Sequence, residues 1–264
     1  MAGVSAIGYI NQFKIGTATA ASSVASMGAS NLSSDQCSPS TGWQTANGVV
    51  TASGGAVLTC TADATSTWRA FALVNTNLTF AATITAGFYI SPATLISSIS
   101  LTNGPQTGYR QVVGVLNSDV TADYVQISIN DAANPDLHIN VGGAFAGPMW
   151  LPQRGISWDT TYASNTIFRS VITDGGQEYR VQRSRRRRWN IALDAVADSE
   201  AWDDLGELDR IASVGGNVLF VPDYTSVDVS REAVFGVLDV LADVSFPMRA
   251  TDNRAWRAQI LERL

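Results

Sequence analysis

The stretch of sequence that decides the fold is Ala56–Ile90, AVLTCTADATSTWRAFALVNTNLTFAATITAGFYI. It contains three runs rich in β-branched and aromatic residues, at Ala56–Thr61, Trp68–Asn75 and Leu78–Ile90. Small and polar residues separate the runs. Runs of this length and composition, bounded by turn-forming residues, are typical of β-strands. The stretch therefore predicts consecutive strands of an antiparallel sheet.

The same pattern continues on both sides of this stretch. Further strand-like runs occur at Asn47–Ala52, Leu95–Leu101, Tyr109–Leu116, Ala122–Ile129 and Leu137–Phe145. Turn signals separate them: Asn-Gly at 47–48 and 103–104, Gly-Gly at 54–55, Asn-Ser-Asp at 117–119 and Asn-Pro-Asp at 134–136. About eight short strands with regular turns predict a jelly-roll-like antiparallel sandwich over residues 31–148.

Residues 1–30 precede the predicted sandwich. Ile7–Ile15 has the composition of a strand, and Ala18–Ser30 is a small-residue stretch that we interpret as a linker. We expect this segment to join the C-terminal domain. It has no basic and apolar export signal, and no window of the chain approaches 18 consecutive apolar residues, so neither export nor membrane insertion is expected.

Residues 149–264 predict a second, α+β domain. Thr166–Thr173 and Glu178–Val196 predict two strands joined by the tight turn Asp174-Gly175-Gly176. Ser199 is a candidate N-cap for one clear helix, in which Trp202, Leu205, Leu208 and Ile211 recur every three residues. Gly215-Gly216 ends that helix. Asn217–Pro222 and Phe235–Phe246 predict two further strands. The fold class is thus mainly β, with a smaller α+β part.

Charge separates the two predicted domains. Of 40 charged residues, residues 1–152 hold nine and residues 153–264 hold 31. The net charge is -6, which argues against nucleic-acid or anionic-membrane binding by the surface as a whole. Lys14 is the only lysine, so the positive charge is carried by planar guanidinium groups.

No sequence motif indicates an enzyme or a cofactor site. Phosphate loops, dinucleotide fingerprints, nucleophile elbows and metalloprotease helices are all missing. His138 is the only histidine, and no serine is marked as its partner. Asp119, Asp131 and Asp136 lie in turn signatures, although a glycosidase pair built from such carboxylates is an alternative. Asn130, Asp131, Asn134 and Asp136 form an oxygen-rich cluster, but their spacing matches no calcium template. We expect no catalytic, cofactor or metal residues.

Two cysteines, Cys37 and Cys60, are too few for a disulfide scaffold or a zinc site. Two alternatives therefore stay open: a single disulfide between Cys37 and Cys60, or two buried thiols.

Aromatic residues of the sandwich are candidates for glycan contact, because a ring face stacks on the apolar face of a pyranose. The candidates are Trp43, Trp68, Phe88, Tyr89, Tyr109 and Tyr124. Trp68, Phe71 and Phe88 lie in β-rich runs and are expected in the core. Trp43, Tyr109 and Tyr124 remain the candidate glycan-contact residues.

The most unusual feature of the sequence is an arginine-rich strand. Arg180, Arg183, Arg185, Arg186, Arg187 and Arg188 fall within nine residues. A strand alternates its side chains between two faces, and both faces are polar here. We therefore expect this end of the strand to protrude from the core.

The helix that follows supplies matching acids, namely Asp198, Glu200, Asp203, Asp204, Glu207 and Asp209. Pairing within one chain would make a local ion-pair network. Pairing between copies would set the register of an assembly, and we favour this reading. A third reading places the arginines against phosphates in a channel.

Several segments together resemble a known family. Trp189–Leu193, the acidic helix near Ala201-Trp202, the Gly-Gly turn, Asn217–Asp223 and Val234–Val237 resemble the ring-forming domain of tailed-phage distal tail and tail-tip proteins. Asn31-Leu-Ser, Gly42-Trp43 and the strand pattern after them are similar to the galectin-like or carbohydrate-binding-module-like sandwiches attached to such proteins. In the family the ring domain comes first, whereas here the sandwich lies inside or before it.

The resemblance implies a structural role. It implies a hexameric ring at the tip of a non-contractile tail, between the tail tube protein and the hub or baseplate protein, with the tape measure protein as a further neighbour. DNA would only pass through the lumen, and the sandwich could contact a host glycan. The protein would be made in the host cytoplasm and reside in the virion. The alternatives are a carbohydrate-binding adhesin and, third, an enzyme that acts on a polysaccharide.

Overall fold

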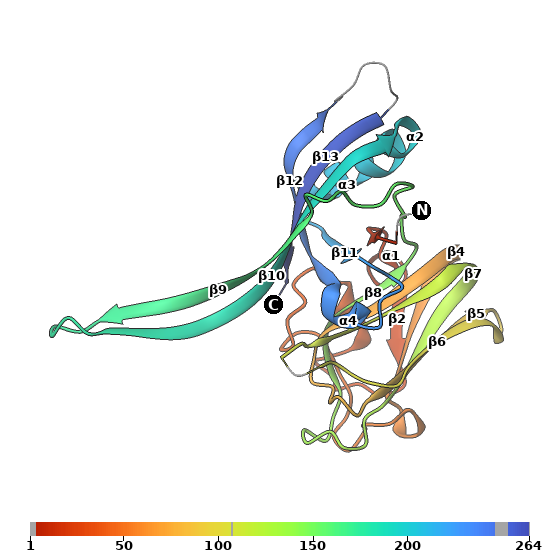
Figure 1. Ribbon diagram of the computed structural model, residues 1–264. Helices are drawn as coiled ribbons and strands as arrows, with labels where there is room; N and C mark the ends of the chain where they lie inside the picture. Colours follow the sequence, from red (N-terminus) through yellow and green to blue (C-terminus); the bar gives the residue numbers. More distant parts are fainter. Residues whose placement is uncertain (1–3, 107, 246–252, 264) are drawn as a thin grey trace. The chain divides into compact units, whose positions relative to one another are not determined.

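The computed structural model describes residues 4–106, 108–245 and 253–263 (Figure 1). The chain divides into two compact units, each built from two separate segments. Val4–Leu151 and Val218–Ala233 form the sandwich unit, and Pro152–Asn217 and Val234–Leu264 belong to the arm unit. Residues 218–233 therefore join the sandwich although they follow the arginine-rich strand in the sequence.

Strands dominate the sandwich unit, which confirms the predicted mainly β class. They are β1 (Ala6–Gly8), β2 (Thr17–Ala20), β3 (Trp43–Gln44), β4 (Val57–Thr76), β5 (Thr83–Ile90), β6 (Thr94–Leu101), β7 (Gln111–Asn130), β8 (Asn140–Gly147) and β11 (Asn217–Val221). The helical segments are short: α1 (Gln12–Ile15), η1 (Ala29–Ser33), η2 (Ala52–Gly54) and α4 (Val229–Glu232).

The main sheet of this unit is antiparallel, with strand order β3-β8-β4-β7-β5-β6 and β2 added against β4. β4 and β7 each span 20 residues, and each serves both layers of the sandwich. The first half of β4 pairs with β2, and its second half pairs with β8. Register shifts between Thr61 and Ser66 and between Trp68 and Ala70 mark the change of layer. Leu58 and Phe71, from opposite halves of β4, consequently pack in one core.

The burial of β4 reflects its sequence. In the first half, side chains alternate between buried and partly exposed, as in a sheet with one covered face. Trp68–Val74 is buried without interruption, so both faces are covered there. β8 is covered in the same way by the N-terminal segment. Asn11 Nδ2 donates to the Ala144 carbonyl at 2.8 Å, and a Cβ on Gly147 would lie only 2.2 Å from the Ile10 carbonyl oxygen.

Several predicted strand boundaries were wrong. Ala56–Thr61 and Trp68–Asn75 are one strand, β4, and Tyr109–Leu116 and Ala122–Ile129 are likewise one strand, β7. The polar segments inside these strands bend them rather than end them. Asp119, predicted in a hairpin turn, lies within β7 and pairs with Arg69 at 3.0 Å. The run Asn47–Ala52 is a loop.

The N-terminal segment also differs from expectation. Only Ala6–Gly8 of the predicted strand is extended, because Asn11 caps α1 by accepting a hydrogen bond from the Phe13 N–H. Part of the expected linker is β2, which pairs with β4 in the sandwich sheet. β1 pairs antiparallel with β11.

The arm unit is built on a four-stranded antiparallel sheet of order β12-β13-β10-β9. Its strands are β9 (Thr161–Ile172), β10 (Glu178–Ala197), β12 (Val234–Ser245) and β13 (Asn253–Glu262). The predicted hairpin of β9 and β10 is confirmed. β13 was not predicted, although Trp256, Ala258 and Ile260 alternate with more exposed residues and are buried. Phe246, the last residue of a predicted strand, lies outside the described residues.

One helical stretch follows β10, made of α2 (Asp198–Glu200), η3 (Ala201–Leu205) and α3 (Gly206–Ser213). It begins at Asp198, so Ser199 lies inside it and does not cap it. Leu205 and Leu208 are buried as expected, but Trp202 is 70% exposed. The Gly216 N–H donates to the Ile211 carbonyl, which confirms the Gly-Gly end. Among the described residues, no helix combines the length and apolar character needed to cross a bilayer.

Candidate functional site

The sandwich unit contains a groove, which we call the main groove. Its volume is about 800 Å³. Three segments supply most of its described lining, namely residues 75–80, residues 105–110 without residue 107, and residues 136–140, and Pro39 adds to it. Each loop lies directly before or after a core strand, so a rigid sheet positions the lining residues.

Asn77 holds the floor of the main groove together. Its Nδ2 donates to Asp136 Oδ2 and to the His138 carbonyl, both at 2.9 Å. Its Oδ1 accepts the Asn140 N–H at 2.8 Å. The side-chain amide of Asn77 thus fixes the loop before β8. Asp136 and His138 also line the groove, and His138 Nδ1 lies 2.8 Å from the Asp136 carbonyl oxygen.

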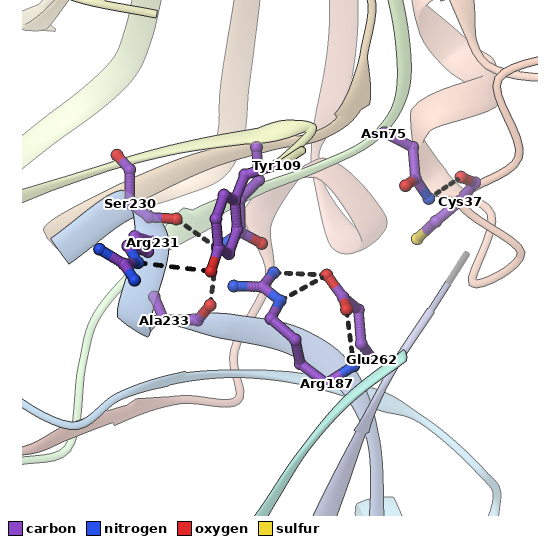
Figure 2. Close-up of polar contacts among 9 residues, drawn as sticks. Cys37, Asn75, Tyr109, Arg187, Ser230, Arg231, Ala233 and Glu262 are labelled. Carbon is purple, nitrogen blue, oxygen red and sulfur yellow. Dashed lines mark hydrogen bonds and ion pairs between the residues drawn. The ribbon is translucent and has the colours of Figure 1, made fainter. Parts of the chain in front are cut away.

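The strand end beside the groove is shaped by a left-handed residue. Asn75 has φ +52°, a conformation that asparagine tolerates better than most residues. Its Nδ2 donates to the Cys37 carbonyl at 2.8 Å (Figure 2). This contact turns the chain out of β4 toward the groove.

Aromatic and cationic side chains form one side of the main groove. Phe80 is 54% exposed although it is wholly apolar. Tyr109 is half-buried, and Arg110 is exposed beside it. Within the described part of the chain, no hydrogen bond or ion pair engages the Arg110 guanidinium. A ring surface next to polar groups is the kind of lining that binds a sugar.

A second, smaller hollow of about 240 Å³ adjoins the main groove, and we call it the side hollow. The two share Phe80, Gln106 and Tyr109. Residues 227–231 supply its other wall. Gln106 Nε2 donates to Asp228 Oδ1 at 2.9 Å, which joins the two walls.

Arg231 fixes the Tyr109 ring between the two hollows. Arg231 Nε donates to the Tyr109 hydroxyl at 3.3 Å (Figure 2). The guanidinium carbon lies 5.8 Å from the ring centre, within the range of a cation–π contact. α4, which carries Arg231, is itself anchored on β7, because Ser230 Oγ accepts the Val113 N–H at 2.9 Å.

The predicted glycan-contact residues have three different positions. Tyr109 lines both hollows. Tyr124 stacks on Tyr89 with ring centres 5.1 Å apart, on another part of the sandwich unit. Trp43 is fully buried and donates its Nε1 proton to the Ser22 carbonyl, so its ring is closed to a ligand. Phe80 was not predicted as a glycan-contact residue. The sequence signal that could have identified it is a phenylalanine between Thr79 and Ala81 in a turn region.

The predicted core aromatics, Trp68, Phe71 and Phe88, are fully buried. Asp131 is also buried, and it accepts hydrogen bonds from the Thr79 N–H at 2.8 Å and from Asn134 Nδ2 at 3.0 Å. The oxygen-rich cluster around it therefore serves as a loop clamp. Cys37 and Cys60 are both buried thiols. Burial raises the pKa of the Cys60 thiol to about 12.

The arginine-rich strand protrudes, as expected. β13 pairs with β10 only from Arg188 to Ala197, so Glu178–Arg187 pairs with β9 alone. Figure 1 shows this hairpin extending beyond the rest of the arm-unit sheet. Arg180 and Arg185 are exposed, and the side chain of Arg183 lies outside the described set. We call residues 161–190 the arm.

Arg187 differs from its neighbours because it points inward. It is 5% exposed, and its guanidinium pairs with Glu262 (Figure 2). Its N–H also donates to Glu262 Oε2 at 2.8 Å. Arg186 and Arg188 are half-buried, and their Nε atoms have no hydrogen-bond partner among the described residues.

The acids of the helical stretch do not pair with these arginines within the described structure. Asp198 pairs with Arg254, Glu207 with Arg210 at 2.5 Å, and Glu200 Oε1 accepts the Gln153 N–H. The hydrogen bond from Arg210 holds the pKa of Glu207 below its usual range. Asp203 is exposed, and Asp204 and Asp209 have other contacts. Among the described side chains, the ion pairs of Asp198 and Glu207 are thus made with Arg254 and Arg210, outside the arginine-rich strand.

The comparisons with known proteins cover about half of the chain. No family model matches the sequence, and no curated protein matches it. Among solved structures, 53% of the chain is similar to the lectin domain of Lectinolysin complexed with Lewis B antigen, at 9% identity, a TM-score of 0.42 and 96% of that chain. The similarity to chitosan-binding module 1 of a chitosanase/glucanase from Paenibacillus sp. IK-5 has the same coverage and TM-score, at 18% identity and 100% of that chain.

The family 32 CBM from C. perfringens NanJ, in complex with galactose, matches 53% of this chain and 98% of its own at 14% identity and a TM-score of 0.40. About half the chain is thus structurally similar to β-sandwich domains of carbohydrate-binding modules and lectins.

Proposed function

We propose that the sandwich unit is a carbohydrate-binding module without catalytic activity, and that the main groove is its ligand site. The observation that carries this proposal is the lining of the groove. An exposed phenylalanine and a tyrosine lie beside Arg110, Asp136 and His138 in one hollow. Sugars need both kinds of surface, because their ring C–H groups pack on aromatics while their hydroxyls need hydrogen-bond partners.

The groove also has the rigidity that a binding site needs. Asn77 fixes the loop before β8, and Arg231 fixes Tyr109. A ligand then pays little free energy to order the site. Arg110, Asp136 and His138 supply polar side chains to the lining, which suits hydroxyl recognition.

The test is binding of the full chain to an array of neutral and acidic oligosaccharides, with titration calorimetry on the positive ones. Phe80→Ala should weaken binding about tenfold, since a stacked ring contributes about 1.5 kcal/mol. The matched control is Leu95→Ala, because Leu95 is 53% exposed on β6 outside both hollows. Equal affinity of Phe80→Ala and wild type would reject the groove, and an empty array would reject the function.

The arm favours a second candidate function, a structural one. In this reading the protein assembles with copies of itself, as in the hexameric tail-tip ring expected from the sequence, within a phage virion between tube and hub proteins. Val171, Tyr179 and Val181 are 49 to 63% exposed on the arm, and both edges of the hairpin beyond Arg188 are open in the described chain. Such a two-stranded ribbon is at best marginally stable alone, so a partner that covers it is favoured.

Charge favours a second copy as that partner. The arm holds seven arginines against Asp174 and Glu178, a net charge of +5, so the rest of the chain carries -11. The arm of one copy and the body of another are therefore complementary.

Light scattering and negative-stain imaging of the purified chain test this candidate. Replacing Arg185 and Arg186 by Gln should reduce assembly, while Arg187 is left in place because it pairs with Glu262. Arg154→Gln is the matched control, as an exposed arginine outside the arm. A wild-type chain that stays monomeric at all concentrations would reject self-assembly.

A further inference from the structure

The main groove and the side hollow are two parts of one surface. Phe80, Gln106 and Tyr109 belong to both linings and form a ridge between them. The two hollows differ in size, at about 800 and 240 Å³. A ligand that fills the main groove and crosses the ridge must therefore contain more than one sugar ring. Its linkage region would lie over Tyr109.

Each hollow contains one arginine. Arg110 lines the main groove, and Arg231 lines the side hollow. The ridge residue Tyr109 belongs to the linings of both hollows and contacts Arg231. Because a guanidinium donates up to five N–H groups in a planar fork, it binds a carboxylate or sulfate better than a hydroxyl.

The charge of the sandwich unit makes this placement unusual. The unit has four basic residues, Lys14, Arg69, Arg110 and Arg231, against nine acidic ones. Lys14 pairs with Asp35 and Arg69 pairs with Asp119, both outside the hollows. The other two basic residues both lie at the ridge. In a unit with this excess of acids, Arg110 nevertheless has no ion-pair partner among the described residues.

We propose that the ligand is an acidic oligosaccharide of two or more units that crosses the ridge and places a carboxylate or sulfate against Arg110. This rests on the proposed function and names its ligand class. Arg231 orients Tyr109 for stacking and adds positive charge on the far side of the ridge. Asp136 and Asp228 lie in the main groove and the side hollow, where they accept hydrogen bonds from sugar hydroxyls and disfavour a ligand that is charged on every unit.

The experiment compares each acidic glycan with its neutral parent. The full chain is titrated with sialyllactose and lactose, and with a disaccharide sulfated on one unit and its unsulfated form. In at least one pair the acidic member should bind about tenfold more tightly, the effect of one charge-assisted hydrogen bond. The monosaccharide of that pair should bind more weakly than the oligosaccharide.

Two variants locate the effect. Arg110→Gln should lower the affinity for the acidic member about tenfold more than the affinity for the neutral one, which removes the preference, and Arg110→Lys should retain part of it. Arg154→Gln, an exposed arginine of the arm unit, should change neither affinity. Circular dichroism and melting curves check that the variants fold.

The outcomes separate the two proposals. Neutral members that bind as well as or better than acidic ones in every pair would overturn the acidic ligand while leaving carbohydrate binding intact. A preference that survives Arg110→Gln would also overturn it. No binding to any glycan would overturn both proposals together.

Discussion

The two units of this protein use charge in opposite ways. The sandwich unit has 13 charged residues, and the arm unit has the other 27 of 40. In the sandwich unit, the run Trp68–Val74 is buried without interruption although it contains Arg69, and several charged residues, such as Asp119, lie within strands. In the arm unit, every residue from Phe168 to Gln182 is exposed. The sandwich unit is stabilised by its buried core, whereas the arm unit exposes a surface that no described residue of the chain covers.

The largest difference between the units should appear on removal of an aromatic ring. Phe71→Ala should lower the free energy of unfolding by about 4 kcal/mol, because a fully buried phenylalanine leaves a cavity. Tyr179→Ala, on the exposed arm, should change it by less than about 0.5 kcal/mol. Urea denaturation of both variants measures this. Similar losses would mean that the arm packs against something in solution.

Breaking the Arg187–Glu262 pair should be the next largest effect. The two side chains are 6% and 17% exposed, so Arg187→Met leaves a carboxylate with little water and no cation. We expect a loss of about 3 kcal/mol in the arm unit, seen as faster hydrogen exchange in β10 and β13. Arg180→Gln, whose partner Glu178 is exposed, should cost under about 1 kcal/mol and is the control. Equal costs would contradict the inward placement of Arg187.

A smaller effect should appear in the pH dependence of the arm unit. A hydrogen bond from Ser157 and the nearby Arg257 hold the pKa of Asp194 below its usual range. A carboxyl with a lowered folded pKa adds stability above its unfolded pKa of about 4, and this stability is lost as the pH falls through the folded value. Asp194→Asn should therefore narrow the difference in stability between pH 6 and pH 3 by under about 1 kcal/mol. An unchanged pH profile would count against the pairing.

The smallest effect concerns the reactivity of the thiols and not the free energy of unfolding. With its pKa raised to about 12 by burial, Cys60 should resist iodoacetamide at pH 8 in the folded protein. Mass spectrometry after labelling in urea should then show both Cys37 and Cys60 modified. Rapid labelling of Cys60 without denaturant would show that the first half of β4 opens readily.

Sequence patterns predicted elements better than they predicted how elements combine. The hairpin of β9 and β10 and the buried Trp68, Phe71 and Phe88 were correct, because alternation and apolar runs are local signals. The division of β4 into two strands was wrong, since Ala62–Thr67 is polar and resembles a loop although its backbone stays extended. The sequence of an interior strand does not specify which strands pair with it.

The candidate site illustrates the same limit. Tyr109 was identified by residue type, but its neighbours come from three loops and from α4, more than 100 residues later. Trp43 met the same compositional criterion and is buried. Only the fold distinguishes a ring that lines a groove from one that fills the core.

The assignment of residues 218–233 to the sandwich unit has a consequence for synthesis. A ribosome releases Val4–Leu151 well before α4, and the arm sequence emerges between them. The sandwich can collapse early, but the wall that holds Arg231 against Tyr109 arrives only after the hairpin has been made. The side hollow should therefore be the last part of this unit to form on a nascent chain, and ligand binding should mature after the core does.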